Sequence, residues 1–586
     1  MQIPVRMKKL LFLLVILISS TACFDQKKQA ESILRHYIDR KVDLIRNYTM
    51  EAEVALWNAT VSGNESDYQK LIDLELNFNK SNQNVSGRFD PDRFYTITQN
   101  VFTNQQDFEL LRKLKLSGLI TDTLLSRQLN VLFQAFMGSQ IESEKYKKLM
   151  MTEIKLWQVF SAAKVQVDGK IYGSAQLDSI RRFSSDDLLL KKIAESIQGT
   201  GKLIAPDIIR MVNDRNGIAN SFGYSDYYHL SLEAKDQTPE KIKKMLDEIE
   251  LKTRDQFFEA KKVIDKMQAR KFGIVESDLR PWHYNDDRTS YLPQSFNQKL
   301  DSLLNQVDPK ERTARFFEGI GFPIQDVIDN SRLEDVPETA NLTAMINVDF
   351  KNDIRLIAGI KNTHDGLIRM MHLGGHASHY KSISDKVPYL LKTPNGVVSE
   401  GVARCFESLA SDYNWLKNEV SADAVFQKDL MIVCQHLRQV DRLIRCRRLL
   451  VFAEFEREIY RDPAQNLDLL WHNLNMKYLG QNYPAEKGEC YWAANKSATS
   501  LSCTIHNYVL ADIFAAQLQH IIQNGVLTKT GSIIQDNKAI GKYLVENLYS
   551  YGNLLPWEKL IEKATGEPLN PEYFVEQLVG DENKSN

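Results

Sequence analysis

The apolar residues of this chain recur mainly at the three- to four-residue spacing of amphipathic helices. One such helix is predicted between Thr238-Pro239, which can cap and start it, and Gly273, which can end it. Strand-like segments are few, and residues 353–360 form the clearest one. The pattern therefore predicts a mostly helical, all-α protein. The apolar positions of the predicted helix are Ile242, Met245, Ile249, Ala260, Ile264 and Met267.

The length of the chain limits its possible domain organisation, and its charge limits its possible partners. Its 586 residues are enough for a large buried core, and the length alone would suggest several domains. No long low-complexity linker and no internal repeat divides the sequence, so we expect one large helical body over residues 23–586, with two lobes around a cleft. The 74 basic and 76 acidic residues balance, and this gives no indication of nucleic-acid binding.

The first 22 residues have the features of a secretory signal peptide. Lys8 and Lys9 precede an apolar run, residues 10–18, and small residues then lead to Cys23. The run is too short to span a bilayer. A cysteine directly after small residues resembles a bacterial lipobox. This predicts that Cys23 is lipidated and holds the protein at a membrane of the cell envelope, facing the periplasm or the exterior. Plain secretion and an uncleaved anchor are the alternatives.

The remaining five cysteines all lie in the C-terminal half of the chain. An odd number leaves at least one thiol free, and no pair has the spacing of a metal site. We expect buried free thiols rather than a disulfide framework, because unpaired cysteines are common core residues. These five residues are Cys405, Cys434, Cys446, Cys490 and Cys503.

The candidate chemistry lies in His372-Leu-Gly-Gly-His376 and in Glu400. Two histidines four residues apart on a helix, predicted here over residues 363–380, lie on one face and can bind one zinc ion. Glu400 is expected in the first turn of a second helix, where the helix dipole favours a carboxylate. Zinc peptidases have a glutamate, the general base, where Leu373 stands. The sequence therefore predicts a metal site that lacks the base.

These motifs resemble those of the angiotensin-converting-enzyme-like branch of the gluzincin peptidases, especially bacterial lipoprotein members. The family pattern is close to H-E-x-G-H-A-x-H and then E-G-x-A-x-x-F-E-x-L-A-S-D, which residues 372–379 and 400–412 match apart from the first Glu. Residues 58–60, 462–480 and 555–566 are also family-like, so the resemblance covers nearly the whole mature chain. It implies a hollow, two-lobed helical ellipsoid with a deep central channel, a zinc ion at its floor and a very small β-sheet near the metal.

The resemblance implies that His372, His376 and Glu400 bind Zn²⁺ and that Leu373 occupies the place of the general base. Without a base, proton transfer to the leaving amine has no carrier, and the rate falls by roughly 10²–10⁴-fold. His379, one turn after His376, is either an extra ligand or a histidine satisfied within its helix, and the second alternative is favoured.

Three further positions depart from the family pattern, and one matches it. Ala344 stands where the family has a histidine that binds the substrate backbone, and Leu501 where it has a histidine that helps hold the oxyanion. Tyr508 matches a tyrosine and is a possible substrate-binding residue. Ala511 stands where converting enzymes place a second tyrosine. Loss of oxyanion donors reduces the rate by roughly a further 10²–10³-fold.

Two functions follow from this pattern. We expect a lipid-anchored, zinc-binding pseudopeptidase with weak or no hydrolysis, which can bind peptides or a protein partner in the channel. The alternative is an active zinc-dependent peptidyl-dipeptidase or carboxypeptidase with a non-standard base, such as Glu407 or Asp365. Glu407 lies two turns beyond Glu400, about 10 Å along the helix, which is too far to replace the missing base.

Overall fold

The computed structural model of the protein describes residues 5–62, 104–137, 165–284, 294–334, 343–419, 424–527 and 534–579, together with scattered residues between 66 and 159. The side chains of the predicted signal peptide and of Cys23 lie outside the described residues. None of the helices formed by the described residues combines the length and the apolar character that crossing a bilayer requires.

Helices account for 74% of the structure, which confirms the mostly helical expectation. The helix predicted after Thr238 is α9, which Thr238 precedes as N-cap and which the left-handed Gly273 ends. The α-helices are α1 (Val5–Ser62), α3 (Gln105–Ser117), α4 (Thr123–Met137), α6 (Ser174–Phe183), α7 (Asp187–Ser221), α8 (Tyr227–Glu233), α9 (Pro239–Phe272), α10 (Gln294–Leu304), α11 (Pro309–Gly319), α12 (Gln325–Asp329), α13 (His364–Lys381), α14 (Gly396–Glu407), α15 (Tyr413–Glu419), α16 (Ala424–His436), α17 (Arg442–Arg461), α18 (Leu467–Leu479), α19 (Lys496–Ser500), α20 (Ile505–Ile521), α22 (Lys538–Asn547), α23 (Trp557–Thr565) and α24 (Glu572–Val579).

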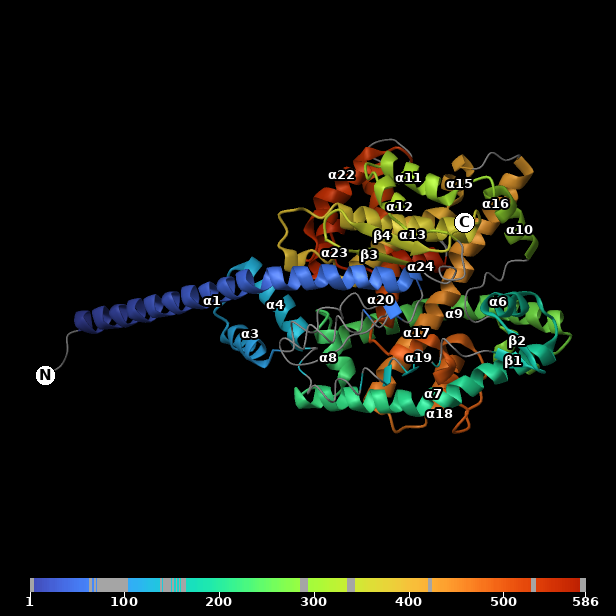
Figure 1. Ribbon diagram of the computed structural model, residues 1–586, viewed down its shortest axis with the longest axis horizontal. Coiled ribbons are helices and arrows are strands. Elements are labelled where there is room, and N and C mark those ends of the chain that lie inside the picture. Colours follow the sequence, from blue (N-terminus) through green and yellow to red (C-terminus); the bar gives the residue numbers. More distant parts are fainter. Residues whose placement is uncertain are drawn as a thin grey trace.

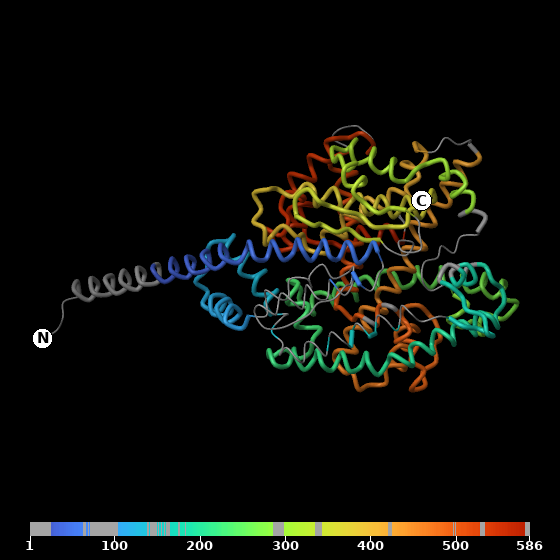
Figure 2. Tube along the Cα trace, viewed as in Figure 1, coloured from blue at the N-terminus to red at the C-terminus, as the bar shows by residue number. Residues whose placement is uncertain are grey.

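The helices form two groups that lie side by side in Figure 1. One group contains α11, α13, α14, α22 and α23, and the other contains α7, α8, α9 and α18. Helix α20 contacts α14 and α23 of the first group and α9 of the second, and it packs against α17, which contacts all four helices of the second group, so α17 and α20 join the two groups. The tube view in Figure 2 follows the same path and shows that the first group comes from the C-terminal half of the sequence, whereas the second combines segments from both halves.

Two buried clusters of apolar side chains hold most of this arrangement together. The larger cluster runs from Leu149 to Leu578 in sequence and includes Leu373 and Leu501. A smaller cluster lies where α1 packs against α3 and α4. On α1, the first buried residue within the described part is Ala30.

Two antiparallel hairpins of two strands each accompany the helices. The strand predicted at residues 353–360 is β4, which pairs with β3. The turn between them is closed by Asp349, whose Oδ1 accepts hydrogen bonds from three successive backbone N–H groups at residues 351–353. This hairpin packs against α13 on one side and α1 on the other. The strands are β1 (Val165–Val167), β2 (Lys170–Tyr172), β3 (Thr343–Asn347) and β4 (Ile354–Ala358).

Candidate metal centre

The two histidines of the predicted site lie on α13. The helix begins after Thr363, whose side chain accepts a hydrogen bond from the backbone N–H of Gly366 and so satisfies one of the free donors of the first turn. It continues to Lys381 without a break at Gly374-Gly375. His372 and His376 therefore stand one turn apart on the same face, as their spacing predicts.

Glu400 lies on α14, but not in its first turn. Asn395 caps the helix by accepting a hydrogen bond from the backbone N–H of Val397, and α14 starts at Gly396. The expectation that the helix dipole holds Glu400 is therefore wrong, because the dipole acts within the first turn. Instead, Arg404, one turn further on, donates from Nε to Glu400 Oε1 at 2.7 Å.

Glycines allow the helices of the site to approach closely. A Cβ at Gly375 would lie 2.7 Å from the Cα of Ala403 on α14, and a Cβ at Gly374 would overlap the ring of Phe317 on α11. On the far side of α14, a Cβ at Gly401 would overlap the ring of Phe514 on α20. These glycines cost helix propensity, and they explain why α13 and α14 come close enough for their side chains to converge.

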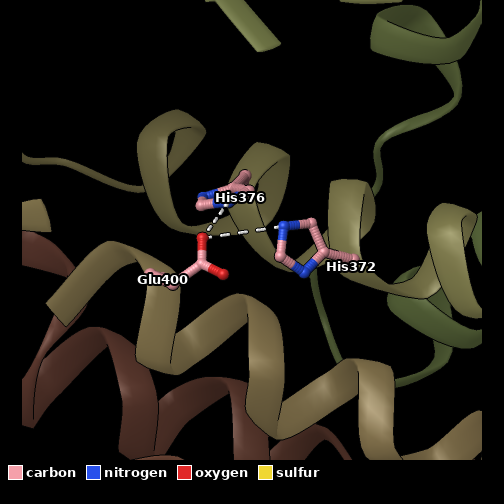
Figure 3. A group of neighbouring side chains, drawn as sticks. All are labelled: His372, His376 and Glu400. Atoms are coloured by element: carbon pink, nitrogen blue, oxygen red, sulfur yellow. Dashed lines mark ion pairs between the residues drawn. The ribbon is translucent and has the colours of Figure 1, made fainter. Parts of the chain in front are cut away.

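One oxygen of Glu400 faces both histidines (Figure 3). Its Oε2 lies 3.7 Å from His372 Nε2 and 3.5 Å from His376 Nε2. Two ligands that each lie roughly 2.1 Å from a tetrahedral metal ion are roughly 3.4 Å apart. The three ligand atoms all lie within 4.8 Å of one another. The residues predicted to bind metal are thus brought together, and the triad could hold a metal ion.

The other ring nitrogen of each histidine is held by a protein partner. His372 Nδ1 lies 2.8 Å from Glu407 Oε2, and His376 Nδ1 lies 2.9 Å from Ser399 Oγ. An ionised carboxylate can only accept, so His372 donates from Nδ1, which leaves Nε2 as the ring nitrogen that can bind a metal ion. Such outer partners fix the tautomer and the ring orientation of metal-binding histidines. The arrangement therefore fits a metal ion on the Nε2 side.

Arg404 connects the carboxylates of the site. Besides Glu400, it contacts both oxygens of Glu407 through Nη1 at 3.0 Å, and its Nε lies 4.0 Å from Asp512 of α20. Arg445 of α17 pairs with the same aspartate at 3.1 Å. Burial alone would lower the pKa of Arg404, but these carboxylates raise it well above its usual range. The guanidinium is thus a permanent positive charge behind the triad.

The ionisation of the site suits metal binding. Burial raises the pKa of Glu400, but Arg404 and the two histidines outweigh this effect and lower it well below its usual range. Burial likewise opposes the influence of Arg404 on Glu407, whose pKa falls to about 2. Burial also lowers the pKa of His376, which keeps its ring neutral. Metal ions bind deprotonated carboxylates and neutral imidazoles, so the triad needs to lose few protons on binding.

The carboxylates considered as substitute bases lie in unsuitable places. Glu407 reaches His372, contrary to its expected distance from the site, but it lies at Nδ1, on the side of the ring away from the metal position. Asp365 is an exposed residue near the start of α13 that pairs with Arg369. Leu373, at the base position, has a relative exposure of 1% and belongs to the main core. Neither acid lies where the sequence comparison expects a general base.

His379 differs from both expectations. It does not belong to the metal-capable group found among the described residues. It is also not satisfied within its helix, because neither ring nitrogen has a hydrogen-bond partner in the described part of the chain. Instead, the ring stacks on Tyr549 at a centroid distance of 4.7 Å, and burial lowers its pKa to about 3. His379 therefore acts as a neutral aromatic residue of the core.

The other positions compared with the family pattern lie on different elements. Ala344 is in β3, where it pairs with Ile357. Leu501 is buried before α20, and its carbonyl accepts a hydrogen bond from the hydroxyl of Tyr460 at 2.7 Å. Tyr508 lies on α20, within electrostatic range of Arg404. Ala511, one turn later, is fully buried against α14.

The five cysteines after Cys23 are free thiols, as expected. Four of them are buried, whereas Cys490 is only half-buried. Burial raises the pKa of Cys405, on α14 next to Arg404, to about 12. That thiol stays protonated and is unsuited to metal binding, which requires the thiolate.

Sequence reasoning missed the roles of Arg404 and Glu407. Their spacing contained a signal, because residues three and four apart on a helix face each other. Glu400, Arg404 and Glu407 follow this spacing and form ion pairs in the structure. No comparable signal in the sequence indicates that Ser399 would bind His376.

Comparison with protein-family models and with curated proteins found no match. The fold and the site together define a mostly helical protein with a two-histidine, one-carboxylate triad that could hold a metal ion.

Proposed function

We propose that this protein is a zinc-binding, peptidase-like protein of the angiotensin-converting-enzyme-like, gluzincin type that hydrolyses peptides weakly or not at all. The observation that carries the proposal is the convergence of His372 Nε2, His376 Nε2 and one oxygen of Glu400, next to a buried leucine at the base position. The family named in the proposal rests on the resemblance of the motif residues described above.

The donor set supports zinc as the metal. Two imidazole nitrogens and one carboxylate oxygen form the ligand set of catalytic zinc sites, which keep a fourth position open. When bound there, zinc would polarise a carbonyl group and lower the pKa of its bound water. Glu407 and Ser399 would orient the histidines, and Arg404 would hold Glu400 with Oε2 toward the metal.

The missing base separates this proposal from an active peptidase. A general base has to lie within hydrogen-bond reach of the proton that it accepts. Leu373 cannot accept a proton, and Glu407 is already bound to His372 and Arg404. The triad would thus supply a metal position with an anchored ligand shell, and neither Leu373 nor Glu407 would activate a water molecule there.

The finer shape of the molecule is part of the proposal. We expect the two helix groups joined by α17 and α20 to enclose the deep channel of the family fold, with the triad at its floor. The hairpin β3–β4, which contacts α13, would be the counterpart of the small family sheet. Such a channel would bind peptides or an extended segment of a protein partner.

The test is metal analysis and a peptidase assay on the same purified protein. After zinc loading and desalting, the natural protein should retain about one zinc ion, and the double variant His372→Ala, His376→Ala should retain none. A mixed peptide library should show little or no zinc-dependent cleavage. Equal zinc contents in the two proteins would refute metal binding, whereas cleavage at a rate typical of enzymes, lost in the double variant, would establish the active peptidase.

Restoring the base provides a second test. Leu373→Glu should give at most a weak gain of hydrolysis, because the side chain enters a buried position and Ala344 and Leu501 still lack the family histidines. A triple variant that adds Ala344→His and Leu501→His should recover more. A folded, zinc-loaded triple variant with no activity would show that Leu373 is not the main reason for inactivity.

We also propose that lipidation of Cys23 tethers the protein to a membrane of the cell envelope. The described side chains that follow Cys23 suit such a tether, because residues 25–29 are exposed or half-exposed and the first buried one is Ala30. Cys23→Ser should release or mislocalise the protein. Unchanged membrane fractionation with an intact N-terminal segment, detected by mass spectrometry, would contradict the proposal.

A further inference from the structure

The turn between α3 and α4 is directed along α1 toward the end of the helix that contains Cys23. Near the start of α3, Asp107 pairs with Lys41 of α1 at 2.5 Å. Beyond its end, the backbone N–H groups of residues 121 and 122 donate to Glu31 Oε1 at 3.0 and 2.9 Å. The helix α3 therefore runs antiparallel to α1, from the level of residue 41 to the level of residue 31. The turn lies at the end of this pair that is nearer to Cys23.

The turn packs on the first buried part of α1 that follows Cys23 within the described residues. Ala30 starts the buried side of the helix there and belongs to the cluster shared with α3 and α4. Figure 1 shows α3 and α4 beside α1, toward its N-terminal end. Glu31 follows Cys23 by 31 − 23 = 8 residues, a rise of about 12 Å along α1. A lipid anchor at Cys23 would therefore bring the turn close to the surface of the bilayer.

Exposed apolar and basic side chains occur on both sides of the turn. Leu116, in the last turn of α3, is 75% exposed, and Leu124, in the first turn of α4, is 41% exposed. Residues 112–121 contain three basic residues and no acidic one. Among them, Lys113 is exposed and forms no ion pair with another described residue. Such a surface suits anionic lipid, because apolar side chains enter the boundary of the acyl chains and cations face the phosphates.

The acidic side chains next to the turn are bound within the protein. Glu31 accepts from the backbone of the turn, and Asp122 pairs with Arg35 of α1 at 2.8 Å. Their charges are directed to groups of the protein, so they oppose an anionic surface less than free carboxylates would. The same contacts hold the turn in one position on α1.

We propose that the α3–α4 turn docks on the bilayer to which Cys23 is tethered, with Leu116 among the lipid headgroups and Lys113 against anionic phosphates. The inference rests on the proposed lipidation and goes beyond it, because a lipid anchor alone leaves the orientation of the protein free. A second contact, held on α1 at a fixed place, determines which face of the molecule is turned to the membrane.

The first experiment measures contact of the turn with lipid. The full chain, expressed with its signal peptide, is reconstituted in vesicles of phosphatidylcholine and phosphatidylglycerol with plain or brominated acyl chains, because bromine quenches tryptophan fluorescence on contact. Brominated lipid should lower the fluorescence that Leu116→Trp adds to the natural protein by roughly twofold or more. Leu203→Trp is the matched control, because Leu203 is 67% exposed on α7, and its added fluorescence should not change.

Mass spectrometry of the N-terminal segment separates this inference from the proposed tether. If Cys23 carries lipid and Leu116→Trp is quenched no more than the control, docking is overturned and the tether stands. If Cys23 carries no lipid, the tether is refuted, and quenching of Leu116→Trp alone would still support docking of the turn. A turn that is not quenched by lipid but crosslinks to another protein in cell envelopes would also overturn the inference.

A second experiment tests the charge of the turn in the Leu116→Trp protein. Adding Lys113→Glu should shift the docking equilibrium roughly tenfold or more toward the undocked turn in vesicles that contain phosphatidylglycerol, so quenching should fall. Lys266→Glu is the control, because Lys266 is an exposed lysine of α9, and it should leave quenching unchanged. Equal quenching in the two variants would overturn the assignment of Lys113 to the lipid phosphates.

Discussion

The metal centre and a second buried polar cluster differ in what their charged side chains contact. The second cluster, here termed the loop clamp, consists of Arg215, Lys235 and Glu456 around the backbone of residues 500–503. Arg215 donates to the carbonyls of residues 500 and 501, Lys235 to those of residues 502 and 503, and Glu456 accepts from the N–H of residue 503. At the metal centre, by contrast, two imidazole nitrogens and a carboxylate oxygen face one another without a hydrogen bond of normal length.

The difference distinguishes a cluster that holds the backbone from a triad that could hold a metal ion. In the loop clamp, charged groups are used to hold a backbone that includes two non-glycine residues with positive φ, 41° at Leu501 and 54° at Cys503. Such conformations cost roughly 1–3 kcal/mol each and persist only where the surroundings impose them. At the metal centre the Nδ1 atom of each histidine has a hydrogen-bond partner. The Nε2 atoms and Oε2 of Glu400 face one another at 3.5–3.7 Å, without a hydrogen bond of normal length. Nitrogen and oxygen atoms that lack hydrogen bonds, next to groups that hold their side chains in place, indicate a ligand better than charge alone does.

The largest expected effect comes from breaking the loop clamp. Arg215→Met would remove the buried guanidinium that pairs with Glu153 at 2.7 Å and donates to the carbonyls of residues 500 and 501. This should lower the free energy of unfolding by about 3–5 kcal/mol, measured by denaturant titration. Arg112→Met is the control, because Arg112 pairs with Glu109 at the surface, where an ion pair contributes about 0–1 kcal/mol. Equal effects of the two changes would show that the clamp is not a structural unit.

The next largest effect should appear in metal affinity alone. Glu407→Gln weakens the partner that fixes His372 and should reduce metal affinity by about 10–100-fold while the protein stays folded. The control, Glu454→Gln, alters a carboxylate that pairs with Arg457 on α17. Competition with a chromophoric chelator measures both affinities. Unchanged affinity in Glu407→Gln would mean that this carboxylate does not orient the ligand.

A glycine substitution should connect packing with metal binding. Gly375→Ala places a Cβ 2.7 Å from the Cα of Ala403, so α13 and α14 have to move apart. We expect a loss of about 1–3 kcal/mol in stability, together with weaker metal binding. Gly396→Ala, at the first residue of α14, has nothing within 4 Å of the added Cβ, so it should lower neither stability nor metal affinity. A stable Gly375→Ala protein with normal metal affinity would show that the close approach is not needed.

The smallest effect is a pH dependence that involves the region of the loop clamp. His506 follows the clamped residues, is fully buried, and has a pKa lowered by burial to about 3. Unfolding restores a pKa of about 6.5, so the unfolded state binds the additional proton. Its contribution to stability is complete above pH 6.5 and is lost as the pH falls toward 3, with a slope of at most about 1.4 kcal/mol per pH unit.

The measurement is unfolding free energy as a function of pH for two histidine variants. His506→Gln should flatten the curve between pH 6.5 and 3, whereas His36→Gln, at an exposed position of α1, should leave it unchanged. If the curve of His506→Gln is as steep as that of the natural protein, other groups cause the acid sensitivity.

Much of the local structure could be predicted from the sequence because its signals are short-range. Thr238 and Gly273 gave the ends of α9, and the spacing of His372 and His376 gave the shared face of α13. The start of α14 was missed, although Asn395 is a residue type that favours the N-cap.

The outer shell of the metal centre could not be predicted in the same way. The contact of Ser399 with His376 depends on how α13 packs against α14, which no spacing in the sequence specifies. The left-handed conformation of Leu501 was equally hidden, because bulky residues rarely adopt it and only the clamp from α7 and α17 imposes it. These features arise from contacts between residues far apart in the chain.

The glycines between the helices have a consequence for how this molecule can change over time. At positions 374, 375 and 401 any side chain would collide with a neighbouring helix, so most mutations there would be removed as folding defects. The same three positions set the spacing that brings the histidines to Glu400. The geometry of the triad is therefore protected by the requirement to fold, and it would persist in descendants of this chain that have no use for a metal ion.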